Sequence, residues 1–359
     1  MRIDRVRVGL VSQSNRDKDW RKGLPKLAGQ GGLILEVSAE GLSGVGYATE
    51  APYTGELLDG MRQVVHQIVQ PMLDGCDPLR VPQLMDRLDV AVLGYPRVKA
   101  AVEVALLDLV AKTGGLPMYA LLGGLYRESI PIIRIVSIKP PSEMADAAER
   151  MVATGYRYLK LKMGHDGTDA ARVRAVRSAV GPDVTLTLDP SGEWSAKQAI
   201  AAMRTMEDLD IALVEQPVRA GDDAGMGVVR HAVAAIVEAD ESADSLAAIY
   251  RVASAGCADA VALKTPKLGG PSNVLRAAAV CRAANIGCRI SKSGESRLSA
   301  LTDMHAIAAI PNIDFACEIG EFARMASDPT DGVEIVNGTL SVTHVPGHGA
   351  TLRDDAFLE

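Results

Sequence analysis

Two stretches of the sequence decide the fold: Tyr158-Leu-Lys-Leu-Lys162 and Val184-Thr-Leu-Thr-Leu-Asp189. Apolar and polar residues alternate in both, which is the pattern of a β-strand because successive side chains point to opposite faces. In the first stretch the leucines share one face, and Lys160 and Lys162 share the other. In the second stretch Asp189 lies opposite the apolar residues. Each strand therefore ends in a polar side chain that points away from the apolar layer.

Short apolar strands recur along the chain. They end near Val136, Lys162, Asp189, Glu215, Asp240, Lys264, Lys292 and Glu318, and all of these ends except Val136 are polar. From the second to the sixth of them the intervals are 27, 26, 25 and 24 residues, and 54 residues, or two intervals of 27, separate the sixth from the eighth. Helical segments fill the gaps, and alternating strands and helices are typical of a parallel sheet. Eight such units predict an α/β fold of the (β/α)₈ or TIM-barrel type.

A doubly wound open sheet would show the same local pattern. When such a sheet binds a dinucleotide, a glycine-rich turn follows its first strand. The nearest candidate, Gly44-Val-Gly-Tyr-Ala-Thr49, lacks the third glycine and lies in a region of antiparallel character. Closure into a barrel is therefore favoured.

The chain before about residue 125 follows another pattern. Apolar alternation around residues 3–8 and 32–39 predicts antiparallel strands, and the charged stretch Asn15-Arg-Asp-Lys-Asp-Trp-Arg-Lys22 between them predicts a loop. Residues 56–125 carry helical spacing and end at the glycine-rich Leu122-Gly-Gly-Leu125. A small sheet followed by helices therefore precedes the barrel.

Composition excludes several classes of protein. The 359 residues are 48% hydrophobic and 23% charged, as in an ordinary globular protein, and no apolar run approaches the roughly 18 residues that span a bilayer. Lys and Arg total 38 against 45 Asp and Glu, for a net charge of −7, which argues against a nucleic-acid partner. The sequence predicts neither a membrane protein nor a nucleic-acid-binding protein.

Cysteine usage and the first residues predict a cytoplasmic location. Five cysteines form an odd set without a CxxC pair, which indicates reduced thiols in the core: Cys76, Cys257, Cys281, Cys288 and Cys317. The start Met1-Arg-Ile-Asp-Arg-Val6 becomes charged too early for a secretory signal.

Three acids end neighbouring strands of the predicted barrel: Asp189, Glu215 and Asp240. The C-terminal ends of barrel strands form the active-site face, so we expect these carboxylates to converge there. Their mutual repulsion would be relieved by a divalent cation, and an all-oxygen set suits Mg²⁺, with Mn²⁺ as an alternative. Helix capping by each acid separately is the competing interpretation.

Two lysines end strands on opposite sides of the ring, Lys162 on the second and Lys264 on the sixth. Burial beside a metal ion or another ammonium group favours a neutral lysine, which could act as a base. Lys160 is placed to depress the pKa of Lys162 and to contact a substrate anion. Glu318 and Glu295 are either structural acids that hold lysines or proton carriers, and both interpretations stay open. We interpret Lys267, by contrast, as an ordinary surface residue.

These residues occur in the order of a known family. The segments that carry the likeness are Lys160-Leu-Lys162, Asp189 with Trp194, Val214-Glu-Gln-Pro217, Ala239-Asp-Glu-Ser242, Ala262-Leu-Lys264 before Gly269-Gly270, Gly287-Cys-Arg-Ile-Ser-Lys-Ser-Gly-Glu295, Glu318 and Val345-Pro-Gly-His-Gly-Ala-Thr351. Over nearly its whole length the chain resembles the muconate lactonizing enzyme subgroup of the enolase superfamily.

The resemblance implies an α+β capping domain at residues 1–125, a barrel at 126–330 and a C-terminal segment at 331–359 that returns to the cap. It implies that Asp189, Glu215 and Asp240 bind Mg²⁺ and that Lys162 and Lys264 are the acid/base pair. Apart from these implied roles, we expect supporting or substrate-binding roles near the mouth for Lys160, Ser191, Glu241, Lys292, Glu295, Glu318 and Trp20.

The chain departs from the family pattern at a few positions. Ser191 stands where an asparagine is common, so a side-chain amide is replaced by a hydroxyl. Lys292 adds a cation in the seventh-strand loop, and the cap loop around Trp20 is rich in charge. We therefore expect a substrate more anionic or polar than a plain diene diacid.

Family chemistry is the removal of a proton beside a carboxylate and the stabilisation of the resulting enediolate. Two lysines on opposite faces suit a racemase or epimerase, whereas cycloisomerisation of a muconate-type diacid and dehydration of a hydroxy acid use the same scaffold. A Schiff-base aldolase or a non-catalytic barrel would leave the three acids without a role. The expected partner is a small-molecule carboxylate, and family members usually form homo-oligomers.

Overall fold

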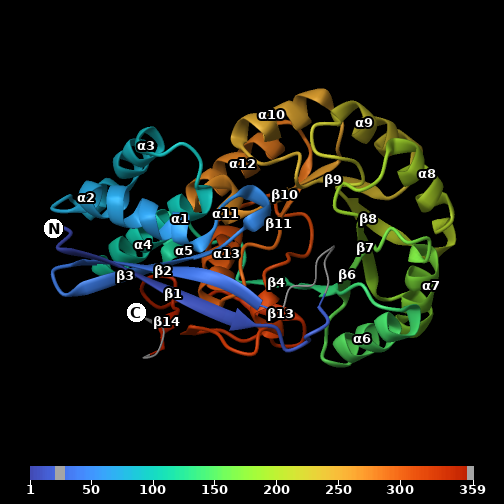
Figure 1. Ribbon diagram of the computed structural model, residues 1–359, viewed down its shortest axis with the longest axis horizontal. Helices are drawn as coiled ribbons and strands as arrows, with labels where there is room; N and C mark the ends of the chain where they lie inside the picture. Colours follow the sequence, from blue (N-terminus) through green and yellow to red (C-terminus); the bar gives the residue numbers. More distant parts are fainter. Residues whose placement is uncertain (21–28, 354–359) are drawn as a thin grey trace.

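The computed structural model describes residues 1–20 and 29–353. A cap built from the first part of the chain lies beside a larger barrel, and the segment that follows the barrel returns to the cap (Figure 1). The described helices include none that is long and apolar enough to cross a membrane.

The cap contains a three-stranded antiparallel sheet with helices packed on it. The strands, in the order β1-β2-β3, are β1 (Arg5–Ser14), β2 (Gly29–Ala39) and β3 (Leu42–Thr49). The helices that follow are η1 (Pro52–Thr54), α1 (Leu58–Val64), the π-helical turn η2 (Val65–Val69), α2 (Gln70–Leu73), η3 (Pro78–Arg80), α3 (Val81–Ala91), α4 (Pro96–Thr113) and α5 (Met118–Leu121). This is the sheet-then-helices order that the sequence predicts.

Glycines let helix α4 lie directly on strand β3. A Cβ atom at Gly44 would lie 2.0 Å from the carbonyl oxygen of Ala105, and one at Gly46 would lie 1.9 Å from that of Ala101. Both contacts are far too short for real atoms, so only glycine permits this approach. The glycine pattern that superficially resembles a dinucleotide-binding turn is therefore a packing feature of the cap.

Seven parallel strands form the wall of the barrel in sequence order: β5 (Ile133–Val136), β6 (Tyr158–Lys162), β7 (Thr185–Asp189), β8 (Ile211–Glu215), β9 (Ile236–Ala239), β10 (Ala260–Leu263) and β11 (Gly287–Ile290). The main helices after them are α6 (Pro141–Ala153), α7 (Asp169–Val180), α8 (Ala196–Arg204), α9 (Asp223–Ala232), α10 (Leu246–Ala255), α12 (Pro271–Ala283) and α13 (Arg297–Ala309). Short turns of helix are η4 (Glu207–Leu209), α11 (Thr265–Leu268) and η5 (Glu321–Arg324). Helices α6 to α10 ring the outside of the strands (Figure 1).

The eighth unit differs from the prediction of a complete strand and helix. The segment around Cys317 is extended and closes the ring, because Cys317 N donates to Pro131 O (3.1 Å) on one side and Glu318 N donates to Ile290 O (3.0 Å) on the other. Its hydrogen bonds are divided between two neighbours, so it forms only an isolated bridge with Ile132. The 3₁₀ turn η5 follows in place of a barrel helix, and the chain then leads back toward the cap.

The C-terminal segment joins the cap to the barrel. Strand β13 (Thr339–Ser341) pairs with β4 (Ser129–Pro131), and β14 (Thr351–Leu352) pairs with β12 (Thr330–Asp331). Between them His348 is fully buried: its backbone N–H donates to Asp108 Oδ1 (2.9 Å), and its Nε2 lies 3.0 Å from Val45 O. The segment around His348 is therefore part of the core of the cap.

Candidate functional site

Side-chain direction in the barrel follows the alternation seen in the sequence. Leu159 and Leu161 are fully buried in the hydrophobic core, whereas Lys160 and Lys162 contact acids contributed by other strands. At the C-terminal edge of the sheet, β6, β7 and β8 end in Lys162, Asp189 and Glu215. Asp240 and Lys264 follow directly after β9 and β10.

Lys162 contacts the first of the three acids. Its Nζ lies 2.5 Å from Asp189 Oδ2 and 3.0 Å from Ser191 Oγ. Ser191 in turn donates from its backbone N–H (2.9 Å) and its hydroxyl (3.0 Å) to Asp189 Oδ1. Burial raises the pKa of Asp189, but Lys162 and Lys160 outweigh it and hold this pKa below its ordinary value. The hydroxyl at position 191 therefore orients a candidate metal ligand and the candidate base together.

Lys160 lies deeper in the barrel and bridges several strands. Its Nζ is 3.0 Å from Glu215 Oε2, 3.2 Å from Asp189 Oδ2, and in contact with Glu318. Burial lowers the pKa of Lys160, but these carboxylates outweigh it and raise the pKa well above the ordinary value. Glu318 thus acts here as a structural acid that holds a lysine. Lys160 is engaged by protein carboxylates on the inside of the barrel.

Asp240 is held by two lysines. Lys264 contacts Oδ2, and Lys267 Nζ lies 2.8 Å from Oδ1 and 2.7 Å from the backbone oxygen of Asp240. The two ammonium groups hold the pKa of Asp240 well below its ordinary value against the effect of burial. Burial lowers the pKa of Lys264, but the carboxylates of Asp240 and Glu215 raise it by more, so the net pKa lies above the ordinary value. The neutral lysine expected from the sequence is therefore not the form favoured in this arrangement. The interpretation of Lys267 as an ordinary surface residue was wrong, because helix α11 turns it back onto Asp240.

The donor set fits a divalent ion in its chemistry. Asp189, Glu215 and Asp240 come from three adjacent strand ends and are at most 3% exposed. In this arrangement ammonium groups lie between the acids, and the described residues contain no three His, Cys, Asp or Glu side chains gathered around one point. Hard oxygen donors with excess negative charge suit Mg²⁺ or Mn²⁺, so a bound cation would take over contacts that the lysines make here.

Gln216 connects the loops that carry two of these acids. Its side chain is fully buried, its Oε1 accepts from the backbone N–H groups of Asp240 (2.9 Å) and Ser242 (3.0 Å), and its backbone is left-handed with φ 40°. Such a conformation is costly for a residue with a side chain and persists where neighbouring contacts enforce it. Gln216 therefore fixes Asp240 relative to Glu215.

The seventh-strand loop and the cap loop meet through Arg324. Its Nη2 lies 2.7 Å from Glu295 Oε1, which also contacts Lys292, and its Cζ lies 4.8 Å from the centre of the Trp20 ring. Trp20 is only 4% exposed. The positive charge of Lys292 is thus balanced by Glu295, and Trp20 packs against the barrel. Residues 21 and 22 of the predicted charged loop lie outside the described residues.

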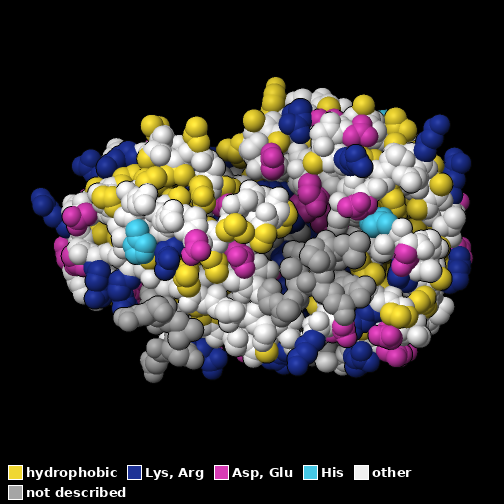
Figure 2. All heavy atoms as spheres, in the orientation of Figure 1, with side chains coloured by type: hydrophobic (Ala, Val, Ile, Leu, Met, Phe, Trp, Pro, Cys, Tyr) yellow, Lys and Arg dark blue, Asp and Glu magenta, His cyan; other side chains and the backbone are white. Residues whose placement is uncertain are grey.

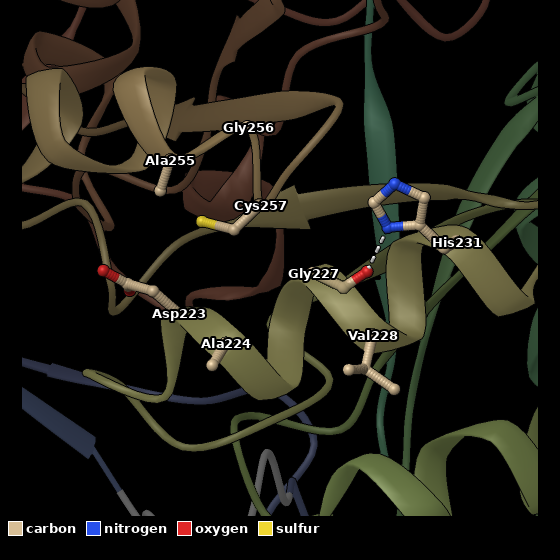
Figure 3. Close-up of a pocket in the computed structure, with 8 residues that line it drawn as sticks. All are labelled: Asp223, Ala224, Gly227, Val228, His231, Ala255, Gly256 and Cys257. Atoms are coloured by element: carbon tan, nitrogen blue, oxygen red, sulfur yellow. Dashed lines mark hydrogen bonds between the residues drawn. The ribbon is translucent and has the colours of Figure 1, made fainter.

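Glu241 is the exposed member of the predicted set, next to Asp240. In Figure 2 acidic side chains gather near the middle of the molecule, where the cap meets the barrel. A separate hollow of about 660 Å³ lies on the outside, between α9 and α10, with Asp223, His231 and Cys257 among its lining residues (Figure 3). None of its lining residues comes from a strand end, so we assign it no part in the reaction.

Three residues of the site were missed or misjudged in the sequence: Lys267, Gln216 and Arg289, whose Nη2 donates to Glu215 Oε2 (2.6 Å). Lys267 lies one helical turn after Lys264, a spacing that returns a side chain to the same place. Arg289 interrupts a short apolar strand at an inward position, which the alternation rule could have identified. The signal for Gln216 is weaker, because its role depends on a backbone conformation that the sequence does not reveal.

Comparison with known proteins shows which family this chain belongs to. Residues 143–356 match the enolase C-terminal domain-like family, and residues 27–123 match the mandelate racemase / muconate lactonizing enzyme N-terminal domain. The chain belongs to the muconate lactonizing enzyme subgroup of the enolase superfamily. The resemblance inferred from the strand-end motifs is thereby confirmed.

Relatives within this subgroup catalyse more than one reaction. The chain is 34% identical over 304 residues to the L-Ala-D/L-Glu epimerase of Bacillus subtilis, covering 82% of each chain. It is 27% identical to a chloromuconate cycloisomerase of Cupriavidus pinatubonensis, covering 99% of this chain and 98% of that one. A dipeptide epimerase from Enterococcus faecalis, solved with Mg and the dipeptide L-Leu-L-Tyr, superposes with a TM-score of 0.92 at 29% identity over 98% of this chain and all of that one.

Membership in this subgroup establishes the class of activity. The chain is an isomerase that removes and returns a proton beside a carboxylate through an enediolate, with a divalent metal ion and a small-molecule substrate. The expectation of a racemase, epimerase or cycloisomerase is confirmed at this level.

Proposed function

We propose that this isomerase epimerises the α-carbon of a dipeptide or another N-acylated amino acid. The observation that carries the proposal is the pair of ammonium groups on opposed strands: Lys162 ends β6, Lys264 follows β10, and the candidate metal ligands lie on the three strands between them. Inversion at carbon requires one group to take a proton from one face and another to give a proton to the opposite face. Epimerases of dipeptides among the relatives share this scaffold at 34% and 29% identity.

We assign Asp189, Glu215 and Asp240 as the ligands of Mg²⁺. A divalent ion at that position would stabilise negative charge on a substrate carboxylate and so make the neighbouring C–H more acidic. The chain's own contribution is to hold both ammonium groups next to the ligands, Lys162 at Asp189 and Lys264 at Asp240. Each lysine must lose its proton before it acts as a base, and release from its carboxylate partner would lower its proton affinity. Ser191 and Lys267 keep these carboxylates oriented through their other oxygens.

Hydrogen exchange in D₂O tests this proposal. Two substrate pairs, dipeptides that are epimers at the α-carbon beside the carboxylate and enantiomers of an N-acyl amino acid, should gain deuterium at that carbon in both members when incubated with the enzyme and Mg²⁺. Lys162→Ala and Lys264→Ala should each retain exchange of one member of a pair at most, because each removes the group on one face. Equal exchange of both members by either variant would contradict the two-base assignment.

Three further measurements separate the alternatives. Excess chelator should abolish exchange, and full exchange in its presence would refute the metal assignment. Cycloisomerisation of muconates is the second candidate, since a chloromuconate cycloisomerase matches the chain over 99% of its length. Turnover of a muconate without exchange of any dipeptide would favour that reaction. Covalent trapping of a lysine by borohydride with a carbonyl substrate would instead indicate a Schiff-base enzyme.

A further inference from the structure

Arg289 is a fully buried arginine inside the barrel. It lies on β11, and its guanidinium reaches past β10 to acids on β9 and β8. The inward positions of the intervening strand are occupied by Ala260 and Ala262, whose small side chains leave room for this crossing. An arginine is costly to bury unless its charge is balanced and its N–H groups are bonded, so its partners are informative.

Those partners are two glutamates in register on neighbouring strands. Glu215 of β8 pairs with Glu238 of β9, and both side chains are at most 1% exposed. Arg289 Nε lies 2.9 Å and 3.1 Å from the two oxygens of Glu238, and Nη2 lies 2.6 Å from Glu238 Oε2. The same Nη2 lies 2.6 Å from Glu215 Oε2. Glu238 therefore fixes the guanidinium, and the guanidinium contacts Glu215.

The two oxygens of Glu215 are held unequally. Oε2 accepts from Arg289 at 2.6 Å and from Lys160 at 3.0 Å, whereas Oε1 accepts from Lys160 alone at 3.2 Å among the bonds of the described residues. Two strong charge-assisted bonds to one oxygen fix the orientation of a carboxylate. Oε1 is the oxygen that is more easily released to another cation.

We propose that Arg289, held by Glu238, is a positioning residue that presents Oε1 of Glu215 to the divalent ion. The inference rests on the proposed function, since it requires Glu215 to be a metal ligand. The proposal adds Arg289 and Glu238 to the site. Neither is a proposed metal ligand, and their described hydrogen bonds do not involve the strand-end lysines. Partners behind metal ligands commonly change metal affinity by roughly 10- to 100-fold when they are removed.

The test is the dissociation constant of Mg²⁺, measured by calorimetry on the folded full-length protein. Replacing Arg289 alone would leave Glu238 buried without a counter-charge, so the main variant replaces both, Arg289→Met with Glu238→Met. A buried ion pair replaced by apolar residues of similar volume generally keeps the fold. We expect Mg²⁺ to bind roughly 10- to 100-fold more weakly, and excess Mg²⁺ to restore much of the isomerase activity.

A conservative variant and a control complete the experiment. Arg289→Lys keeps the charge but cannot bond both glutamates as a planar fork, so we expect a smaller loss of Mg²⁺ affinity. Asp108→Asn perturbs a fully buried acid in the cap, with similar risk to stability, and should leave Mg²⁺ affinity unchanged. Circular dichroism establishes that each variant is folded.

Each outcome decides the proposal. Unchanged Mg²⁺ affinity in the folded double variant, or in Arg289→Lys if the double variant does not fold, would overturn the positioning role and leave the proposed function intact. Failure of the unaltered protein to bind Mg²⁺ would overturn both. An equal loss of affinity in Asp108→Asn would show that general destabilisation, and not orientation of Glu215, accounts for the effect.

Discussion

Asp303 of helix α13 makes folding stability depend on pH in a direction opposite to that of an ion-paired acid. Its side chain is 1% exposed, Thr265 Oγ1 donates to it at 2.6 Å, and Ser293 provides a second hydroxyl. Burial raises its pKa from 3.8 to about 7, against the smaller opposing effect of the two hydroxyls. The folded protein therefore keeps this carboxyl protonated until the pH approaches about 7, whereas the unfolded chain releases the proton near pH 4.

The sign and size of the effect follow from this difference. Because the folded state binds the proton more tightly, the contribution of Asp303 to stability is full below about pH 4 and is lost as pH rises to about 7. A difference of about three pKa units corresponds to about 4 kcal/mol. Asp303→Asn remains neutral at every pH and still offers an oxygen to Thr265.

Urea denaturation of both proteins between about pH 5 and about pH 8 measures this contribution. We expect the stability of Asp303→Asn relative to the unaltered protein to increase by about 1.4 kcal/mol for each pH unit up to about pH 7, and then to level off. A stability difference that is the same at every pH would refute the reasoning, because it would mean that Asp303 has the same proton affinity in both states.

Substitutions at three other positions, one of them with a matched control, test the packing of Gly46, the hydrogen bonds of Gln216 and the buried imidazole of His305 in helix α13. Gly46→Ala should destabilise the cap by about 3 kcal/mol or more, because its Cβ would lie 1.9 Å from a backbone oxygen. Gly114→Ala is the control and should be nearly neutral, because its Cβ would have no neighbour closer than 3.6 Å. Thermal unfolding compares the stability of the two variants. Gln216→Met should cost about 2 to 4 kcal/mol in urea denaturation because two buried N–H groups lose their acceptor, and a loss below about 1 kcal/mol would contradict that role. Burial lowers the pKa of His305 to about 4, so the free energy of unfolding should fall by about 3 kcal/mol from about pH 6.5 to about pH 4. His305→Gln should remove this part of the pH dependence of stability, which acid titration of unfolding measures.

Much of the fold could be predicted because its pattern is local. Alternation within Tyr158–Lys162 determined which residues face the interior, and the regular spacing of strand ends gave the parallel wall. The eighth unit was predicted incorrectly as a full strand and helix. Its hydrogen bonds depend on both neighbours, Pro131 on one side and Ile290 on the other, and that closure cannot be derived from the segment itself.

The sequence identified polar residues that the structure brings together at the strand ends, but it did not reveal their contacts. Position at strand ends selected Asp189 and Lys264, and family resemblance supplied their expected roles. Charge pairing was harder, because the partners come from distant parts of the chain: Glu295 neutralises Lys292 and also binds Arg324. The extra cation of the seventh loop therefore does not by itself indicate an anionic substrate.

The burial of His348 beneath the cap has a consequence for biosynthesis. The cap precedes the barrel along the chain, yet Asp108 and Val45 bond to a residue of the segment that follows the barrel. Until that residue has been synthesised, the nascent cap lacks a piece of its interior. Vectorial synthesis therefore cannot finish this protein one domain at a time, and its first domain is the last to be completed.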